Sequence, residues 1–285
     1  MKRHAVAAIA ILALLTPPLG TIARAWEGRV DENIVSLAVQ ALPASPLADF
    51  FNRNQIALQD HATEPNTVLK KRYGQTEEIR HYLEVEIYRP KEFDALSSSY
   101  TEMVRQFGLA TLIRSGTLPW TIAEESGKLR DAWAKGDCAD VLRQAGYLAN
   151  YVGDASQPLD TTIYSDGYPQ DRGIHRRIED AADNHANLIW REDRGQVHVS
   201  PAASPWDAAI AELRGAHSHV QELIEADRAA RAESKGDPEK YNKFLMDAER
   251  PLFDQQIAGA ASVLASIWVA QWEAAGSSDK CSAAH

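Results

Sequence analysis

The sequence is poor in cysteine and in positive charge. Only two cysteines, Cys138 and Cys281, occur in 285 residues, which excludes a disulfide-rich scaffold. They could pair in an oxidising compartment, but the sequence does not give the distance between them. Asp and Glu outnumber Lys and Arg by 40 to 30, for a formal net charge of −10. Because such a surface repels a phosphate backbone, nucleic acid is not expected as a partner.

Long apolar runs are also scarce. The chain opens with basic residues at 2–4, an apolar run over 5–15 and the small-x-small pattern Ala23-Arg24-Ala25. This is the pattern of an export signal that is cleaved after residue 25. The run is too short to span a bilayer, and no later stretch is expected to be long and uncharged enough. We predict a signal peptide over 1–25 and a mature chain that starts at Trp26 and is exported to the periplasm or the medium.

No Gly/Ser-rich linker or internal repeat divides the mature chain, which predicts one domain over 26–275. The small, polar residues 276–285 predict a flexible tail. Apolar residues recur at three- and four-residue steps over 101–113, 120–133 and 138–152, and two long helices are predicted over 206–230 and 241–272. Only 81–88 hints at a strand, so the predicted fold class is all-α.

The residues best suited to chemistry lie between positions 150 and 179. Asn150 and Asp154 are four residues apart, as are His175 and Glu179, so each pair shares one face of a helix. A proline ends the first helix and lets Asp160 fold back towards the same centre. These spacings suit metal chelation, although a His and a Glu one turn apart are also a common surface ion pair.

This stretch resembles the signature of the zinc-dependent phospholipases C, a fold shared with the fungal single-strand-specific zinc nucleases. The matching segments are Asn150-Tyr-Val-Gly-Asp154-Ala-Ser-Gln-Pro-Leu-Asp160 and His175-Arg-Arg-Ile-Glu179. The closing Glu179 and the short gap before His175 are similar to the phospholipase branch. Further similarity lies in the N-terminal Trp26, in Glu77-Glu-Ile-Arg-His81 with Asp60 before it, and in Gly116-Thr-Leu-Pro-Trp120.

The resemblance implies a single multi-helix domain that holds up to three metal ions. One ion would be held by Asp60, His81, Asn150 and Asp154, a second by Asp160, His175 and Glu179, and a third by Trp26, Asp31 and the bridging Asp154. Asp60 would also orient or deprotonate the attacking water. Asn33 is an alternative to Asp31, since both are polar residues near the start of a predicted helix. Asp31 is equally well placed to cap that helix, over 32–42, instead of binding a metal.

The sequence departs from the family at three positions, since Asp31, Asn150 and Asp160 stand where the family has histidine. Zinc is expected from the family, but oxygen-rich shells suit calcium, magnesium or manganese. Three possibilities stay open: the site binds zinc more weakly, it binds a harder cation instead, or it no longer turns over substrate. The other histidines near these segments are not expected to replace the lost ligands: His61, His185, His217 and His219.

The function implied by the resemblance is that of a secreted, metal-dependent phosphoesterase that hydrolyses phospholipids or other phosphoesters. We expect a monomer with transient contact to a membrane surface, although no basic amphipathic helix marks such contact. A nuclease or 3′-nucleotidase is one alternative, disfavoured by Glu179 and the negative charge. A non-catalytic secreted relative is another, favoured by the loss of three histidines.

Overall fold

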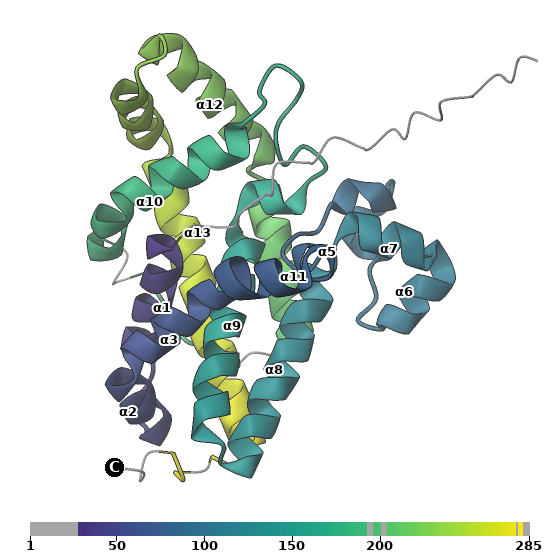
Figure 1. Ribbon diagram of the computed structural model, residues 1–285, viewed down its shortest axis with the longest axis vertical. Coiled ribbons are helices and arrows are strands. Elements are labelled where there is room, and N and C mark those ends of the chain that lie inside the picture. Colours follow the sequence, from purple (N-terminus) through teal and green to yellow (C-terminus); the bar gives the residue numbers. More distant parts are fainter. Residues whose placement is uncertain (1–27, 193–195, 201–203, 278, 282–285) are drawn as a thin grey trace, which may run out of the picture.

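The computed structural model describes residues 28–192, 196–200, 204–277 and 279–281, and every regular element among them is a helix (Figure 1). The predicted all-α fold is therefore confirmed. The buried apolar residues of the helices form one cluster that extends from the first helix to the last. The predicted signal peptide and Trp26 lie outside the described residues.

The elements follow one another along the chain, and most connections between them are short. In order they are α1 (Arg29–Ala41), α2 (Pro46–Arg53), α3 (Gln55–Glu64), the π-helix η1 (Pro65–Leu69), α4 (Lys70–Tyr73), α5 (Gln75–Glu78), the 3₁₀-helices η2 (Val85–Tyr88) and η3 (Glu92–Ala95), α6 (Tyr100–Phe107), α7 (Leu109–Ser115), α8 (Leu118–Lys135), α9 (Cys138–Ser156), the 3₁₀-helix η4 (Pro158–Thr161), α10 (Ile174–Glu192), α11 (Pro205–His217), α12 (Val220–Ser234) and α13 (Pro238–Ala274).

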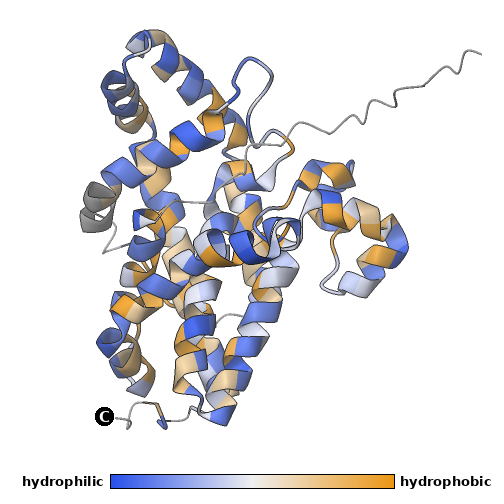
Figure 2. Ribbon diagram, viewed as in Figure 1, coloured by the Kyte–Doolittle hydropathy of each residue, from blue (hydrophilic) through white to orange (hydrophobic). Residues whose placement is uncertain are grey.

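Helix α9 lies at the centre of the fold, packed against α3, α8 and α13 (Figure 1). It begins after Asp137, whose carboxylate accepts a hydrogen bond from the backbone N–H of Asp140 at 3.1 Å, as an N-cap does. From Leu148 to Ser156 every residue is buried. Most other helices carry hydrophilic and hydrophobic residues side by side, as amphipathic helices around a core do (Figure 2). In contrast, the last two turns of α9 are buried on every side, so their polar side chains need partners inside the protein.

Helix α13 is long and apolar enough, by length and composition alone, to cross a membrane. This differs from the expectation that no stretch after the signal peptide would be. However, 67 % of the apolar stretch is buried inside the protein, and Leu264, Ile267 and Trp268 have no exposed surface. The stretch forms part of the hydrophobic core.

Two secondary-structure predictions were wrong. The helix expected over 206–230 is divided into α11 and α12, and the hydroxyl of Ser218 donates to the carbonyl oxygen of Gly215 at 2.7 Å where α11 ends. The strand hinted at over 81–88 is an irregular segment followed by η2. Its backbone makes isolated bonds, from Leu83 N to Asp160 O at 2.8 Å and from Glu84 N to Ser115 O at 2.7 Å, rather than a ladder.

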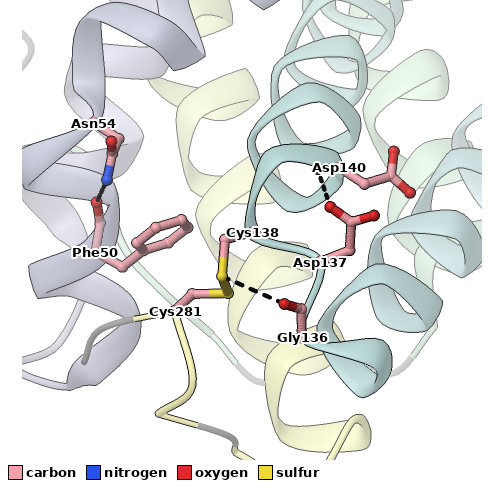
Figure 3. Close-up of a disulfide and its surroundings, with 7 residues drawn as sticks. All are labelled: Phe50, Asn54, Gly136, Asp137, Cys138, Asp140 and Cys281. Carbon is pink, nitrogen blue, oxygen red and sulfur yellow. Dashed lines mark hydrogen bonds between the residues drawn. A yellow bond between two sulfur atoms is a disulfide. The ribbon is translucent and has the colours of Figure 1, made fainter. Parts of the chain in front are cut away.

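The two cysteines, whose pairing the sequence left open, form a disulfide (Figure 3). It joins the start of α9 to the C-terminal segment, with a Cα–Cα distance of 5.4 Å. Cys281 is buried, although it lies in the segment predicted to be a flexible tail. The bridge therefore fixes this part of the tail against the helical core.

Two buried aspartates bind the loop before α10 to the end of the molecule formed by α12 and α13. Asp171 accepts two hydrogen bonds from Arg228, at 2.8 and 2.7 Å, and Asp227 accepts two from Arg177, both at 2.8 Å. The Arg228 guanidinium lowers the pKa of Asp171. Tyr241 of α13 also donates to Asp227, at 2.8 Å. This network holds the first turns of α10, where His175 and Glu179 lie.

Candidate metal centre

Most of the predicted ligands are buried side chains from α1, α9, η4 and α10 and from the segment before η2. They share an exposed fraction of at most 5 %: Asp31, His81, Asn150, Asp154, Asp160, His175 and Glu179. Charged side chains are rarely buried to this extent without a partner. Asp31 interacts electrostatically with Asp154 and Glu179, and Asp160 with Asp154 and His175, so one cluster holds them. We call these seven residues the acidic cluster.

Local sequence explains how the central helix and its exit contribute to the cluster. Asn150 and Asp154 are one turn apart and neither has exposed surface. After α9, the side chain of Gln157 accepts a hydrogen bond from Leu159 N at 2.6 Å, which forms the tight turn of η4. The turn returns Asp160 to the cluster, as predicted from the proline.

The segment that carries His81 is held by the turn at 116–120. Thr117 N donates to the carbonyl oxygen of Ile79 at 2.6 Å, and Leu118 N donates to that of Tyr82 at 3.3 Å. A Cβ atom at Gly116 would lie 2.1 Å from the Tyr82 carbonyl oxygen, so only glycine permits this approach. The turn recognised in the sequence thus positions a candidate ligand.

One half of the cluster is built around Asp154. His81 Nδ1 lies 2.8 Å from Asp154 Oδ2, and His81 Nε2 lies 3.4 Å from Glu77 Oε1. One turn earlier on α9, Asn150 Nδ2 donates to Oδ2 of Asp31 on α1 at 3.2 Å. The structure thus brings together four predicted ligands from three separate segments.

The other half is built around His175. Its Nδ1 donates to the carbonyl oxygen of Ser165 at 3.2 Å, which directs Nε2 towards the cluster. Nε2 lies 2.9 Å from Glu179 Oε1 and 3.6 Å from Asp160 Oδ1. Metal-binding histidines commonly donate their second N–H to a carbonyl oxygen in this way.

The carboxylates of the cluster lie close enough together to disfavour one another's negative charge. Burial raises the pKa of Asp31 and of Asp160 well above the ordinary value, and neighbouring carboxylates raise both further. Burial also raises the pKa of Asp154, although His81 opposes the shift. Burial disfavours a charge on His175, but Glu179 and Asp160 together raise its pKa to about 10. Such a cluster favours a bound cation.

The unsatisfied atoms of the cluster support a cation more directly. Four buried oxygens have no hydrogen-bond donor: Asp31 Oδ1, Asn150 Oδ1, Asp154 Oδ1 and Asp160 Oδ2. Buried acceptors without a donor are costly unless something positive lies beside them. Among the described residues, no three His, Cys, Asp or Glu side chains are close enough to form a ligand shell as they stand. The donor set fits a divalent cation, but the His81–Asp154 and His175–Glu179 pairs would have to open to bind one.

The structure does not bring every predicted ligand into the cluster. Asp60 lies on α3 with an exposed side chain, and it influences the pKa of Glu32 rather than that of the buried aspartates. The alternative Asn33 donates instead to the carbonyl oxygen of Ala186 at 2.8 Å. Asp31 lies inside the first turn of α1 rather than at its N-cap, which is Gly28. Of these three, only Asp31 belongs to the cluster.

Sequence reasoning missed two residues next to the cluster. Glu77 is 3 % exposed, accepts a hydrogen bond from the hydroxyl of Tyr151 and contacts His81. The four-residue spacing between Glu77 and His81, the same as between His175 and Glu179, could have revealed it. His217, which was not expected to replace a lost ligand, is half-buried and lies 3.2 Å from the carbonyl oxygen of Thr161, the residue after Asp160.

The other histidines lie as expected outside the cluster. His61 Nδ1 lies 3.1 Å from Glu64, and His185 Nδ1 donates to the carbonyl oxygen of Ala181 at 2.8 Å. His219 is bonded to Glu222 at 2.7 Å. None of them replaces a lost imidazole.

A cavity of about 690 Å³ is lined in part by Glu77 and Tyr151, which both contact His81. Its wall carries four cationic side chains, Arg72, Arg80, Lys128 and Arg143. Arg80 and Lys128 pair with Glu125, which leaves part of this charge neutralised. The cavity is a candidate entrance for an anionic group near the cluster.

Comparison with known proteins gives the fold but no family. No protein-family model and no curated protein matches the sequence. Among solved structures, the alpha toxin from Clostridium absonum matches with a TM-score of 0.54 at 10 % identity, over 88 % of this chain and 65 % of that chain. The alpha toxin from an avian strain of Clostridium perfringens gives a TM-score of 0.48 at 14 % identity, over 86 % and 66 %. The chain thus spans less than two thirds of both toxins, and the first match shows a shared fold alone.

Proposed function

We propose that this chain is an exported, metal-dependent phosphoesterase whose acidic cluster binds divalent cations, with phospholipids as its substrates. The observation that carries the proposal is the set of four buried oxygens without donors beside two imidazoles. These atoms belong to residues at the metal-ligand positions of the zinc-dependent phospholipase C signature, which the resemblance assigns to histidine at Asp31, Asn150 and Asp160 and to aspartate at Asp154. The all-helical fold shared with the alpha toxin from Clostridium absonum agrees with that resemblance.

The cation favoured by this cluster has both oxygen and nitrogen ligands. Aspartate or asparagine oxygens take the place of three imidazoles, while His81 and His175 remain. Manganese accepts such a mixed shell, and zinc accepts it with lower affinity than a shell richer in histidine. We therefore propose manganese or zinc as the cation, with calcium and magnesium as the alternatives to test.

A bound divalent cation would bind phosphate oxygens and lower the pKa of a bound water. The chain itself holds the ligands in place for this chemistry. The Ser165 carbonyl oxygen orients the His175 ring, and Glu77 orients the His81 ring against Asp154. The exposed side chain of Asp60 gives no support to its predicted role in activating water.

The substrate proposal is tested with the mature protein, purified after export. The assay measures head-group release from phosphatidylcholine vesicles, and hydrolysis of single-stranded DNA and 3′-AMP, with each cation and with chelator. We expect head-group release that chelator abolishes and manganese or zinc restores. Preferential hydrolysis of DNA or 3′-AMP would instead support the nuclease alternative, and no hydrolysis with any cation would support the non-catalytic alternative.

A matched pair of variants on α10 connects the activity to the cluster. His175→Ala removes a cluster imidazole, and we expect a loss of activity of at least about tenfold to a hundredfold, which is what loss of a ligand's supporting partner alone causes. His185→Ala removes a half-buried histidine from the same helix, outside the cluster, and should retain activity. Equal activity of both variants would contradict the assignment of the site.

A further inference from the structure

Asp160 differs from Asp154 in how its side chain is held in the acidic cluster. Asp154 Oδ2 lies 2.8 Å from His81 Nδ1, within hydrogen-bond distance. Asp160 Oδ1 lies 3.6 Å from His175 Nε2, which is longer than a hydrogen bond, and its Oδ2 has no hydrogen-bond donor. The position of the Asp160 carboxylate therefore depends on its backbone.

The helix that carries Asp160 is too short to hold this position alone. Helix η4 has four residues, and 3₁₀-helices have poorer hydrogen-bond geometry than α-helices. The carbonyl oxygen of Asp160 accepts a bond from Leu83 N at 2.8 Å, in the segment that carries His81. A functional ligand must be held within about 0.5 Å of its productive position. Contacts from other elements therefore decide whether η4 places Asp160 correctly.

One of these contacts comes from α11, in the C-terminal third of the chain. His217 Nδ1 lies 3.2 Å from the carbonyl oxygen of Thr161 and 3.1 Å from its hydroxyl oxygen. That hydroxyl donates its own hydrogen to the carbonyl oxygen of Pro158 at 2.7 Å, so both Thr161 oxygens are acceptors for His217. His217 Nδ1 therefore carries a hydrogen and donates it to the residue directly after Asp160.

A second contact comes from η2. Glu86 has a side chain that is 3 % exposed, and it accepts hydrogen bonds from the hydroxyl of Thr162 and, at 3.0 Å, from Ile163 N. Its Oε1 lies 3.9 Å from His217 Nε2, and the His217 ring packs edge-on against Phe93 of η3. Glu86 and His217, which we call the η4 clamp, thus hold the residues that follow Asp160 from two separate elements.

We propose that the η4 clamp positions the Asp160 carboxylate for a bound cation. Glu86 and His217 are positioning residues and not ligands, because they act through the backbone and hydroxyl groups of residues 161–163. This role rests on the proposed function, because it concerns the affinity of that cation site. It also gives α11 a part in the site, whereas every predicted ligand lies at or before Glu179.

The test measures the affinity of the mature protein for manganese and for zinc by calorimetric titration. The temperature is one at which circular dichroism shows every variant to be folded, so that a loss of stability alone leaves the affinity unchanged. We expect His217→Ala to bind each cation about tenfold to a hundredfold more weakly, as loss of a ligand's outer partner does. His217→Asn keeps a side-chain N–H near the place of Nδ1 and should recover most of the affinity. His219→Ala is the control, because His219 bonds Glu222 instead of η4, and it should bind like the wild type.

Glu86→Gln tests the other half of the η4 clamp, also where His217→Ala does not fold. Glutamine has one side-chain oxygen and an NH₂ group, so it cannot accept from both Thr162 and Ile163, and cation affinity should fall. Glu84→Gln is the matched control, since Glu84 is half-buried in the same segment and its side chain has no bond to η4 in the described part of the chain. Equal affinity of Glu86→Gln and Glu84→Gln would contradict the role of Glu86.

Hydrogen exchange in chelator measures the positioning without a cation. The amides of residues 160–163 should exchange faster in His217→Ala than in His219→Ala. Equal exchange in these two variants, or equal cation affinity of His217→Ala and the wild type, would overturn the proposal while leaving the proposed function intact. A wild type that binds no cation would instead refute the proposed function, and the role of the η4 clamp with it.

Discussion

Replacing Asp154 by asparagine should reverse the order of stability between wild type and variant when a divalent cation is added. Asp154 has no exposed surface, Oδ2 lies 2.8 Å from His81 Nδ1, and Oδ1 has no donor. Asparagine has nearly the same side-chain size as aspartate and keeps an oxygen that can accept a hydrogen bond from His81, but it carries no charge. Without cation, the variant should be at least as stable as the wild type, because burial raises the pKa of Asp154 and so disfavours its ionised form.

With cation, the wild type should be the more stable of the two. A cation that binds only the folded chain stabilises it by about 4 kcal/mol at roughly a thousand times its Kd. For a chain of this size, that corresponds to a rise in Tm of about 8 to 16 °C. Asp154 is the carboxylate proposed to bridge two cations, so the variant should lose most of this rise and retain less than about 3 °C.

The assay is thermal unfolding of both proteins in chelator and at a series of manganese and zinc concentrations. Asp131→Asn is the control, because Asp131 is an exposed aspartate on α8 that lies outside the cluster. It should show the same cation-dependent rise as the wild type. An equal rise in Asp154→Asn and in the wild type would refute the reasoning.

Three further predictions concern features outside the cluster. Asp60→Asn should leave the cation-dependent rise in Tm unchanged, since Asp60 is exposed, and loss of the rise would return Asp60 to the ligand set. Cys138→Ser with Cys281→Ser opens a loop of 143 residues and should lower the free energy of unfolding by up to about 5 kcal/mol in urea titrations; a loss below about 1 kcal/mol would contradict this. Burial raises the pKa of Glu212 from 4.5 to about 7. Because the folded protein disfavours the ionised carboxylate, its free energy of unfolding falls as pH rises through that range. Glu212→Gln should therefore be more stable than the wild type at pH 8 by up to about 3 kcal/mol, and not at pH 5; a difference that is the same at both pH values would contradict the assignment.

Features governed by local rules could be predicted from the sequence. Asn150 and Asp154 share a face because they are one helical turn apart, and both are buried. Asp160 returns to the cluster because the chain turns at the preceding proline. The all-α class followed from apolar residues at three- and four-residue steps.

Asp60 lies outside the cluster, and the same helical rule explains why. Leu58 and Ala62 are the buried residues of α3, and each lies two positions from Asp60. Two positions correspond to about 200° around a helix, so Asp60 faces away from the core. The residue type at position 60 fits the family, but its place on the helix does not direct it towards the cluster.

Other features depend on contacts between distant segments. The residues 81–88 alternate like a strand because they cross the interior, yet their backbone bonds go singly to Asp160 and Ser115. The Cys138–Cys281 bridge joins residues 143 positions apart, which spacing cannot reveal. Helix α3 continues into the π-helix η1, and the sequence carried no recognised signal for that change of helix type.

The metal content of the mature protein measures directly whether the acidic cluster binds divalent cations. The protein is purified from its export route without chelator and analysed by elemental mass spectrometry, beside Asp154→Asn. We expect at least one and up to three divalent cations per chain in the wild type and a clear loss in the variant. Wild-type protein that holds no cation, even after incubation with manganese, zinc, calcium and magnesium in turn, would contradict it.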